Sequence, residues 1–125
     1  MNILIIEDDK LTLNALQHSL EKLGHTVALA VNGEQAIDQI KSKQFDLLIS
    51  DVMMPGISGL SLVTVLRQVH LCFTPIIMMS TLHNRPLLDA AFKAGANDFL
   101  NKPFTAEELE LKLKKIEKKD AESSR

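Results

Sequence analysis

The sequence lacks the features that mark disulfide-bonded, nucleic-acid-binding, membrane-spanning and secreted proteins. Its single cysteine, Cys72, cannot form a disulfide within the chain, as is usual in a reducing cytoplasm. Trp and Tyr are absent and the formal net charge is −2, so no basic, base-stacking surface for nucleic acid is expected. No apolar run approaches the roughly 18 residues of a membrane span, and apolar residues 2–6 run directly into acids, unlike a signal peptide. We therefore expect a cytoplasmic protein that binds neither nucleic acid nor membrane.

The chain does contain enough apolar material for one packed domain. Hydrophobic residues make up 46% of its 125 residues, an ordinary share for a globular fold. A chain of this length buries about two-thirds of the surface that its unfolded form exposes, so it needs no disulfide or structural metal. We place the domain at residues 1–119 and interpret residues 120–125 as a polar tail or the start of a linker.

Short apolar runs alternate along the chain with longer amphipathic segments. The runs predict buried strands at residues 2–6, 25–29, 45–49, 75–79 and 98–100. The first predicted helix carries leucines at helical spacing and ends before Gly24, and the others are expected after residue 32, at 60–69, at 85–94 and after Thr105. Asp9 is expected to cap the first helix, and Thr105 with Glu108 forms the pattern of a capping box for the last.

Strict alternation of strands and helices predicts an α/β fold. Right-handed crossovers place helices on both faces of a parallel sheet, and five strands favour an open, doubly wound sheet over a closed barrel. With the first strand central, the order is 2-1-3-4-5, which is the flavodoxin-like three-layer arrangement. Such sheets bind ligands at the carboxyl ends of their strands, beside the switch point between strands 1 and 3.

Polar residues follow four of the five predicted strands. They are Glu7 and Asp8, Asp51, Ser80 and Thr81, and Asn101 and Lys102. Each of these residues alone has an ordinary structural explanation, such as a helix cap or a turn. Their arrival together at one edge of one sheet indicates a functional site.

The charges at this edge suggest the chemistry. Crowded carboxylates repel each other unless a cation lies between them, and an all-oxygen ligand set suits Mg²⁺. A carboxylate that is held beside a phosphoryl group can act as its nucleophile. The sequence therefore favours one of these strand-end carboxylates as a phosphate acceptor, with the Lys102 ammonium and the Ser80 hydroxyl stabilising the transferred oxygens.

Four segments in order resemble the receiver domains of bacterial response regulators. They are residues 5–9 (IIEDD), 48–56 (LISDVMMPG), 76–81 (IIMMST) and 95–104 (GANDFLNKPF), within a resemblance that covers about residues 1–119. This resemblance implies a two-component phosphorylation switch in which Asp51 accepts a phosphoryl group from a sensor histidine kinase or phosphotransfer protein. Asp8, Asp51 and the Met53 backbone carbonyl would hold Mg²⁺, which Glu7 reaches through water. Such a domain is not an enzyme beyond its own phosphorylation and dephosphorylation.

The same resemblance implies a switch in the other two segments. Ser80 stands where threonine is commoner but keeps the hydroxyl, and Thr81 is bulkier than the small residue usual there. On phosphorylation Ser80 moves toward the phosphate, Phe99 turns inward, and the face of the fourth helix, fifth strand and fifth helix changes. Pro103 matches a proline that often follows a cis peptide bond in the family.

Two hypotheses go beyond the family pattern. Met53 and Leu82 flank the phosphorylation site and are both apolar, so neither can orient a water, and we expect slow self-dephosphorylation. Leu111 lies off the apolar stripe of the last helix and is a candidate contact in a phosphorylation-dependent homodimer.

Three alternatives are weaker. A flavodoxin-like cofactor domain would want glycines or hydroxyls where Glu7 and Asp8 stand, because acids repel a phosphate. A phosphatase with Asp51 as nucleophile usually carries a second acid at the position of Met53. A receiver that binds partners without phosphorylation would not need the complete acidic and basic set.

Overall fold

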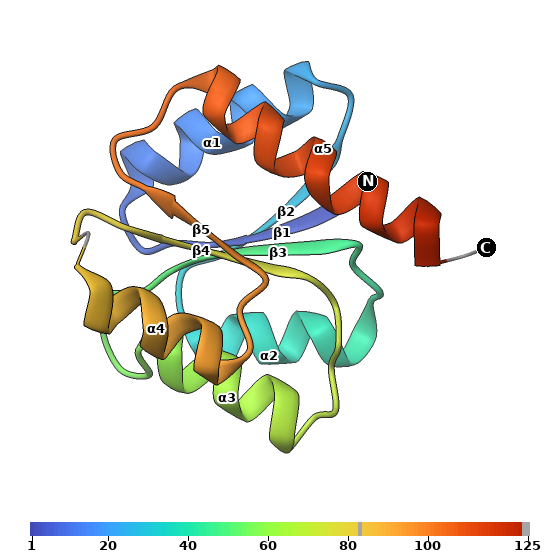
Figure 1. Cartoon of the computed structure of the whole chain (residues 1–125). Helices are drawn as coiled ribbons and strands as arrows, with labels where there is room; N and C mark the ends of the chain where they lie inside the picture. The colour runs from blue at the N-terminus through green and yellow to red at the C-terminus, as the bar shows by residue number, and fades with distance from the viewer. Residues whose placement is uncertain (83, 124–125) are drawn as a thin grey trace.

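The structure is a computed structural model that describes residues 1–82 and 84–123, and the side chains of 120–123 are not described. Within these residues five strands alternate with five helices (Figure 1). The strands are β1 (Asn2–Ile6), β2 (Thr26–Ala30), β3 (Leu47–Asp51), β4 (Ile76–Ser80) and β5 (Asp98–Asn101). The helices are α1 (Lys10–Lys22), α2 (Gly33–Ser42), α3 (Gly59–Gln68), α4 (Arg85–Ala94) and α5 (Ala106–Ser123).

The strands form one parallel sheet in the order β2-β1-β3-β4-β5, which confirms the predicted topology. Helices α1 and α5 cover one face of the sheet and α2, α3 and α4 cover the other (Figure 1). Successive strand residues point to opposite faces, so each strand contributes to both layers. In β1, for example, Leu4 and Ile6 join the core under α2, α3 and α4, whereas Ile3 and Ile5 join the core under α1 and α5.

Both predicted helix caps are present. The Asp9 carboxylate accepts hydrogen bonds from the backbone N–H of Thr12 at 3.1 Å and from its hydroxyl at 2.6 Å. At the last helix the Thr105 hydroxyl accepts from the N–H of Glu108 at 3.1 Å, and Glu108 accepts from the N–H of Thr105 in return. These side chains satisfy N–H groups that a helix leaves without partners, and thereby fix where α1 and α5 begin.

Four of the five strands end later than the apolar runs predicted, whereas β1 occupies its predicted residues. β3 was expected at residues 45–49 and occupies Leu47–Asp51, because its ladder with β1 starts with Leu47 opposite Ile3. The polar residues Asp51, Ser80 and Asn101 are therefore the last residues of their strands rather than the first residues of loops. The hydrogen-bonding ladder, which composition does not reveal, places these candidate site residues on the sheet itself.

Helix α5 continues to Ser123, past the predicted domain boundary at residue 119. The first part of the predicted tail is thus helical, whereas its last residues, 124–125, lie outside the described residues. The boundary itself stays a prediction. No helix in the described part of the chain combines the length and the apolar character needed to cross a bilayer.

Candidate phosphorylation and metal site

The backbone at the strand ends holds the predicted site residues in place. Asp51 and Ser80 end the neighbouring strands β3 and β4, while Glu7 directly follows β1 and Lys102 directly follows β5. Glu7 and Lys102 lie just beyond their strands, but their backbones still form hydrogen bonds to the neighbouring strands. The N–H of Glu7 donates to the Ala30 carbonyl at 3.0 Å, and the N–H of Lys102 donates to the Ser80 carbonyl at 2.8 Å. The four side chains therefore start from fixed positions on one edge of the sheet.

Lys102 joins the ends of three strands through its ammonium group. Its Nζ lies 2.7 Å from Asp51 Oδ2 and 3.2 Å from each carboxylate oxygen of Glu7. Glu7 is 1% exposed and Asp51 is 7% exposed, so both ion pairs are shielded from water. Charge-assisted hydrogen bonds of this kind are the strong ones in proteins, and here they hold Asp51 in one orientation.

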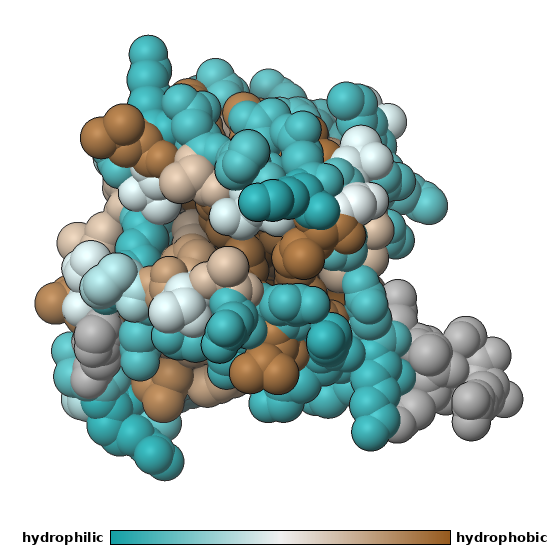
Figure 2. Space-filling view, turned by 90° about the horizontal axis from the view of Figure 1, so that it is seen from above, coloured by the Kyte–Doolittle hydropathy of each residue, from teal (hydrophilic) through white to brown (hydrophobic). Residues whose placement is uncertain are grey.

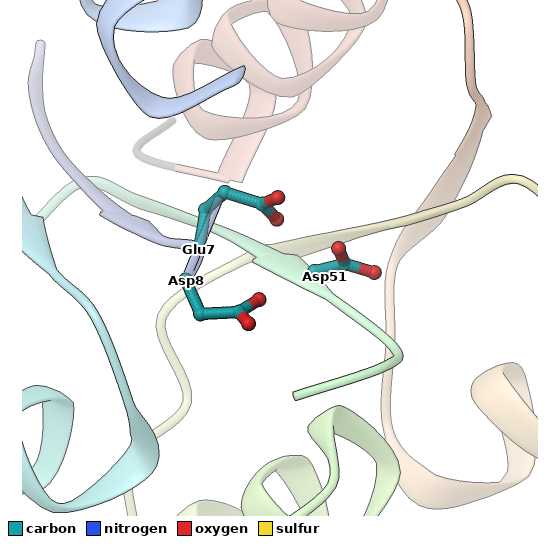
Figure 3. A group of neighbouring side chains, drawn as sticks. All are labelled: Glu7, Asp8 and Asp51. Carbon is teal, nitrogen blue, oxygen red and sulfur yellow. The ribbon is translucent and has the colours of Figure 1, made fainter. Parts of the chain in front are cut away.

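Three carboxylates gather beside this ammonium. Glu7, Asp8 and Asp51 each offer an oxygen, and these oxygens all lie within 4.8 Å of one another. The side chains of Glu7 and Asp8, which follow β1, extend toward Asp51 at the end of β3 (Figure 3). Glu7 is buried, whereas Asp8 is exposed and open to solvent. Such an all-oxygen set with an open side suits Mg²⁺, which binds one or two carboxylates and keeps several waters.

The balance of charges at this site also suits a bound cation. Burial, followed by hydrogen bonding with and charge repulsion from Asp51, raises the pKa of Glu7 from 4.5 to about 7, although Lys102 acts in the opposite direction. For Lys102, burial lowers the pKa, but hydrogen bonds and charges of Asp51 and Glu7 outweigh it, and the net shift is upward. The single positive charge of Lys102 does not neutralise the three carboxylates, and a divalent cation would neutralise the remaining negative charge.

Two backbone N–H groups complete the site, and sequence reasoning missed both. The N–H of Met53 donates to Asp51 Oδ1 at 3.0 Å, and the N–H of Leu82 donates to the Ser80 hydroxyl at 3.0 Å. Every residue except proline carries such a donor, so the side-chain pattern gives no signal for it. The loops after β3 and β4 therefore position the Asp51 carboxylate and the Ser80 hydroxyl as much as the strands do.

Gly59 is a second feature whose role only the structure defines. It is the first residue of α3, and its N–H donates to the Val52 carbonyl at 2.8 Å. A Cβ at this position would collide with the carbonyl oxygen of Asp51. Glycine therefore lets α3 begin directly against the end of β3, which fixes the loop that carries Met53.

The residues that flank the site point outward. Met53 is 62% exposed and Leu82 is 50% exposed, so neither apolar side chain is part of the core. Thr81 is exposed as well, and it lies beside Lys102 in the wall of one cavity. The Lys102–Pro103 peptide bond is cis.

Phe99 lies on the face that was predicted to respond. Its ring is 8% exposed and packs in the core under α2, α3 and α4, so it is already turned inward. The rotation of Phe99 expected on phosphorylation stays a prediction. Leu111, on α5, is 64% exposed, which confirms its predicted position off the buried stripe.

A cavity of about 410 Å³ adjoins the site between α1 and α5. Its walls include Leu16 and Leu109 from the two helices, Phe104 from the connecting loop, and Lys102 at the end nearest the acidic cluster. Viewed onto the layer of α1 and α5, the surface shows an apolar hollow framed by polar side chains (Figure 2). The charged site is thus bordered by apolar surface on its α1 side.

Comparisons with known proteins agree with this geometry. The family model described as the response regulator receiver domain matches residues 3–114. The transcriptional regulatory protein CrdR of Helicobacter pylori is 36% identical over 114 residues, which are 91% of this chain and 54% of that protein. The alkaline phosphatase synthesis transcriptional regulatory protein PhoP of Bacillus subtilis is 32% identical over 91% of this chain and 47% of its own length. The chain thus spans about half the length of these curated relatives.

Solved structures give the same result for the fold. A putative response regulator from Chloroflexus aurantiacus aligns with a TM-score of 0.87 and 39% sequence identity, covering 92% of this chain and 95% of that one. The chain therefore belongs to the response regulator receiver domain family, as a phosphoacceptor module of two-component signalling.

Proposed function

We propose that Asp51 is the phosphoacceptor of this domain and that the carboxylates around it form its Mg²⁺ site. The observation that carries this assignment is the contact of one ammonium, on Lys102, with both Asp51 and Glu7 at the edge of the sheet. Asp51 is the acid that donors on two sides hold in place, Lys102 at Oδ2 and the Met53 N–H at Oδ1. It is therefore oriented as a nucleophile needs to be.

Mg²⁺ would be held by Asp8, Asp51 and the backbone carbonyl of Met53, with Glu7 reaching it through water. Bound there, the ion supplies positive charge that neutralises the carboxylates and the oxygens of an incoming phosphoryl group. The exposed side of the cluster, at Asp8, leaves room for waters and for phosphate oxygens.

In the reaction, a carboxylate oxygen of Asp51 attacks phosphorus of a phosphohistidine on a partner kinase or phosphotransfer protein. The bond between phosphorus and the histidine nitrogen breaks, and that nitrogen leaves with the electron pair. Lys102 then pairs with the transferred oxygens, since an ammonium stabilises charge that develops on a phosphoryl group. The domain thus catalyses only its own phosphorylation and, with water as acceptor, its own dephosphorylation.

The switch would run through Ser80. Its hydroxyl accepts a hydrogen bond from the Leu82 N–H at 3.0 Å, so a move toward the phosphate breaks this bond and shifts the loop before α4. Phe99, already packed beneath that helix, repacks as α4 moves. The result is a change in the face of α4, β5 and α5, which is a population shift between two packings.

This face would deliver the output. The partner on the input side is a sensor histidine kinase or phosphotransfer protein, and the relatives named as transcriptional regulators make control of an attached or separate effector the favoured output. The exposed Leu111 could join a homodimer that forms on phosphorylation. Light scattering of the protein with and without phosphorylation, compared with Leu111→Glu, tests that dimer.

The acceptor is tested by incubating the protein with acetyl phosphate, with and without Mg²⁺, and measuring the intact mass. We expect a gain of one phosphoryl group that requires Mg²⁺ and is lost in Asp51→Asn. The control is Asp38→Asn, which removes an exposed acid of α2 far from the site and should leave the gain unchanged. A gain that persists in Asp51→Asn would contradict the assignment.

A flavodoxin-like cofactor site or an Asp-dependent phosphatase is less well supported. The acids at the end of β1 would repel the phosphate of a flavin nucleotide. The position of a second phosphatase acid is held by Met53, whose side chain points into solvent.

A further inference from the structure

The five methionines of this chain differ sharply in their exposure, and one of them lies at the phosphorylation site. Met78 and Met79 of β4 are 0% exposed, whereas Met53 is 62% exposed. Met1 and Met54 are half-buried and pack against the two cores. A thioether is a target of hydroperoxides, and its reactivity follows its access to solvent.

The outward position of Met53 is fixed by the structure around it. Val52, which is 2% exposed, and Met54 fill the core positions on either side of it. The start of α3 packs directly beneath this loop, because Gly59 leaves no side chain between the helix and β3. The Met53 N–H is held by Asp51 Oδ1. The Met53 side chain therefore has no buried alternative and stays accessible.

We propose that Met53 is a redox-sensitive modification site, at which oxidation to the sulfoxide by a hydroperoxide shortens the lifetime of the phosphoryl group on Asp51. This inference rests on the proposed function of Asp51. In the reaction the O–O bond of hydrogen peroxide breaks, one oxygen bonds to sulfur, and the other leaves as water after taking up both protons. Sulfur loses two electrons and the peroxide gains them.

The effect follows from the change in polarity. Met53 and Leu82 donate their backbone N–H groups to Asp51 and to Ser80, and their exposed apolar side chains cannot bind water. A sulfoxide oxygen is a strong hydrogen-bond acceptor, so oxidation brings an ordered water to the side of the phosphoryl group. Hydrolysis of the aspartyl phosphate thereby becomes faster, and oxidation resets the switch.

The first experiment treats the full chain with dilute hydrogen peroxide and maps the oxidised residues by peptide mass spectrometry. Met53 should gain one oxygen before Met54, Met78 or Met79. The oxidised and untreated proteins are then phosphorylated with acetyl phosphate and Mg²⁺, freed of the donor, and followed by intact mass. We expect a severalfold shorter phosphoryl lifetime after oxidation.

Two variants separate the role of Met53 from general damage. Met53→Leu removes the reactive sulfur, so its phosphoryl lifetime should be the same before and after peroxide, whereas Met54→Leu should respond as the unmodified sequence does. Earlier oxidation of another methionine, equal lifetimes with and without oxidation, or an unchanged response in Met53→Leu each overturn the proposal. If the untreated protein gains no phosphoryl group, the proposed function fails together with this inference. A normal gain with an unaltered lifetime overturns the inference alone.

Discussion

Two cationic side chains tie elements together at opposite ends of the sheet, and their surroundings differ in charge. At the carboxyl end, Lys102 contacts the carboxylates of Glu7 and Asp51. At the amino end, Arg67 of α3 donates to the carbonyls of Cys72, Thr74 and Gly95 and to the side-chain oxygen of Asn97, at 2.7–3.2 Å. The first cation thus meets an excess of negative charge, whereas these partners of Arg67 are neutral oxygens.

The difference shows in the direction of the two pKa shifts. Burial lowers the pKa of Arg67 and outweighs an opposing contribution from Cys72. The pKa of Lys102 is raised, because the charges of Asp51 and Glu7 outweigh its burial. The Arg67 guanidinium already donates hydrogen bonds to neutral oxygens, so no excess of negative charge favours a change of its partners. An ammonium among several carboxylates can share them with a metal or move to a phosphate, which is the role that we propose for the carboxyl end, whereas the contacts of Arg67 connect α3 to the segments that lead into β4 and β5.

The largest expected effect on stability is at Arg67. Arg67→Met leaves several carbonyl oxygens without donors, and we expect the free energy of unfolding to fall by about 3 kcal/mol. Urea unfolding measures this loss, which should be the same with and without Mg²⁺. The control is Arg85→Met, because the Arg85–Asp89 pair is exposed and its removal should cost less than about 1 kcal/mol. Equal losses in both variants would contradict the structural role of Arg67.

A smaller loss, which Mg²⁺ repairs, is expected at the other end. Lys102→Met leaves the carboxylates of Glu7 and Asp51 without their shared ammonium, so stability near neutral pH should fall by about 2 kcal/mol. Added Mg²⁺ binds the folded state and should restore most of the loss, as thermal unfolding in a metal titration would reveal. In Lys112→Met, which breaks a pair with Asp98 instead, Mg²⁺ should restore nothing. A Lys102→Met loss that Mg²⁺ leaves unchanged would refute a shared cation site.

Glu7→Gln is expected to act in the opposite direction. The folded-state pKa of Glu7 is about 7 and its unfolded value is 4.5, so the folded state holds a proton that the unfolded state has lost between these values. Without Mg²⁺, stability should therefore fall as pH rises through this window. Glu7→Gln should remove that fall and gain about 1 kcal/mol near pH 8, with little gain near pH 4. If the stability gained in Glu7→Gln did not depend on pH in urea unfolding, the ionisation of a buried Glu7 would not be the cause of that gain.

The smallest expected effect is on the phosphorylated state alone. Because Met53 and Leu82 are apolar and exposed beside the acceptor, the unmodified domain should lose its phosphoryl group slowly. Leu82→Asn should shorten this lifetime severalfold without changing stability, as intact mass measured over time would show. Loss of the phosphoryl group within seconds in the unmodified protein would contradict this prediction.

The fold and most of the side chains of the site could be predicted from the sequence. The alternation of buried runs with helices determined a doubly wound sheet, and its topology brought Glu7, Asp51, Ser80 and Lys102 to one edge. The boundaries were less accurate, because β3 starts where its ladder with β1 starts and not where the apolar run begins. The Met53 and Leu82 N–H donors were not predicted, since every residue carries this group.

The sequence by itself determined which chemical groups are available and at which strand ends they stand, because both follow from residue type and strand order. Only the tertiary structure decided how those groups are paired. It placed one ammonium between two acids, raised the pKa of Glu7 by burying it beside Asp51, and required glycine at residue 59 for α3 to contact β3. The reason is physical: ion pairing, desolvation and close packing depend on distances between residues far apart in the chain, and folding sets those distances.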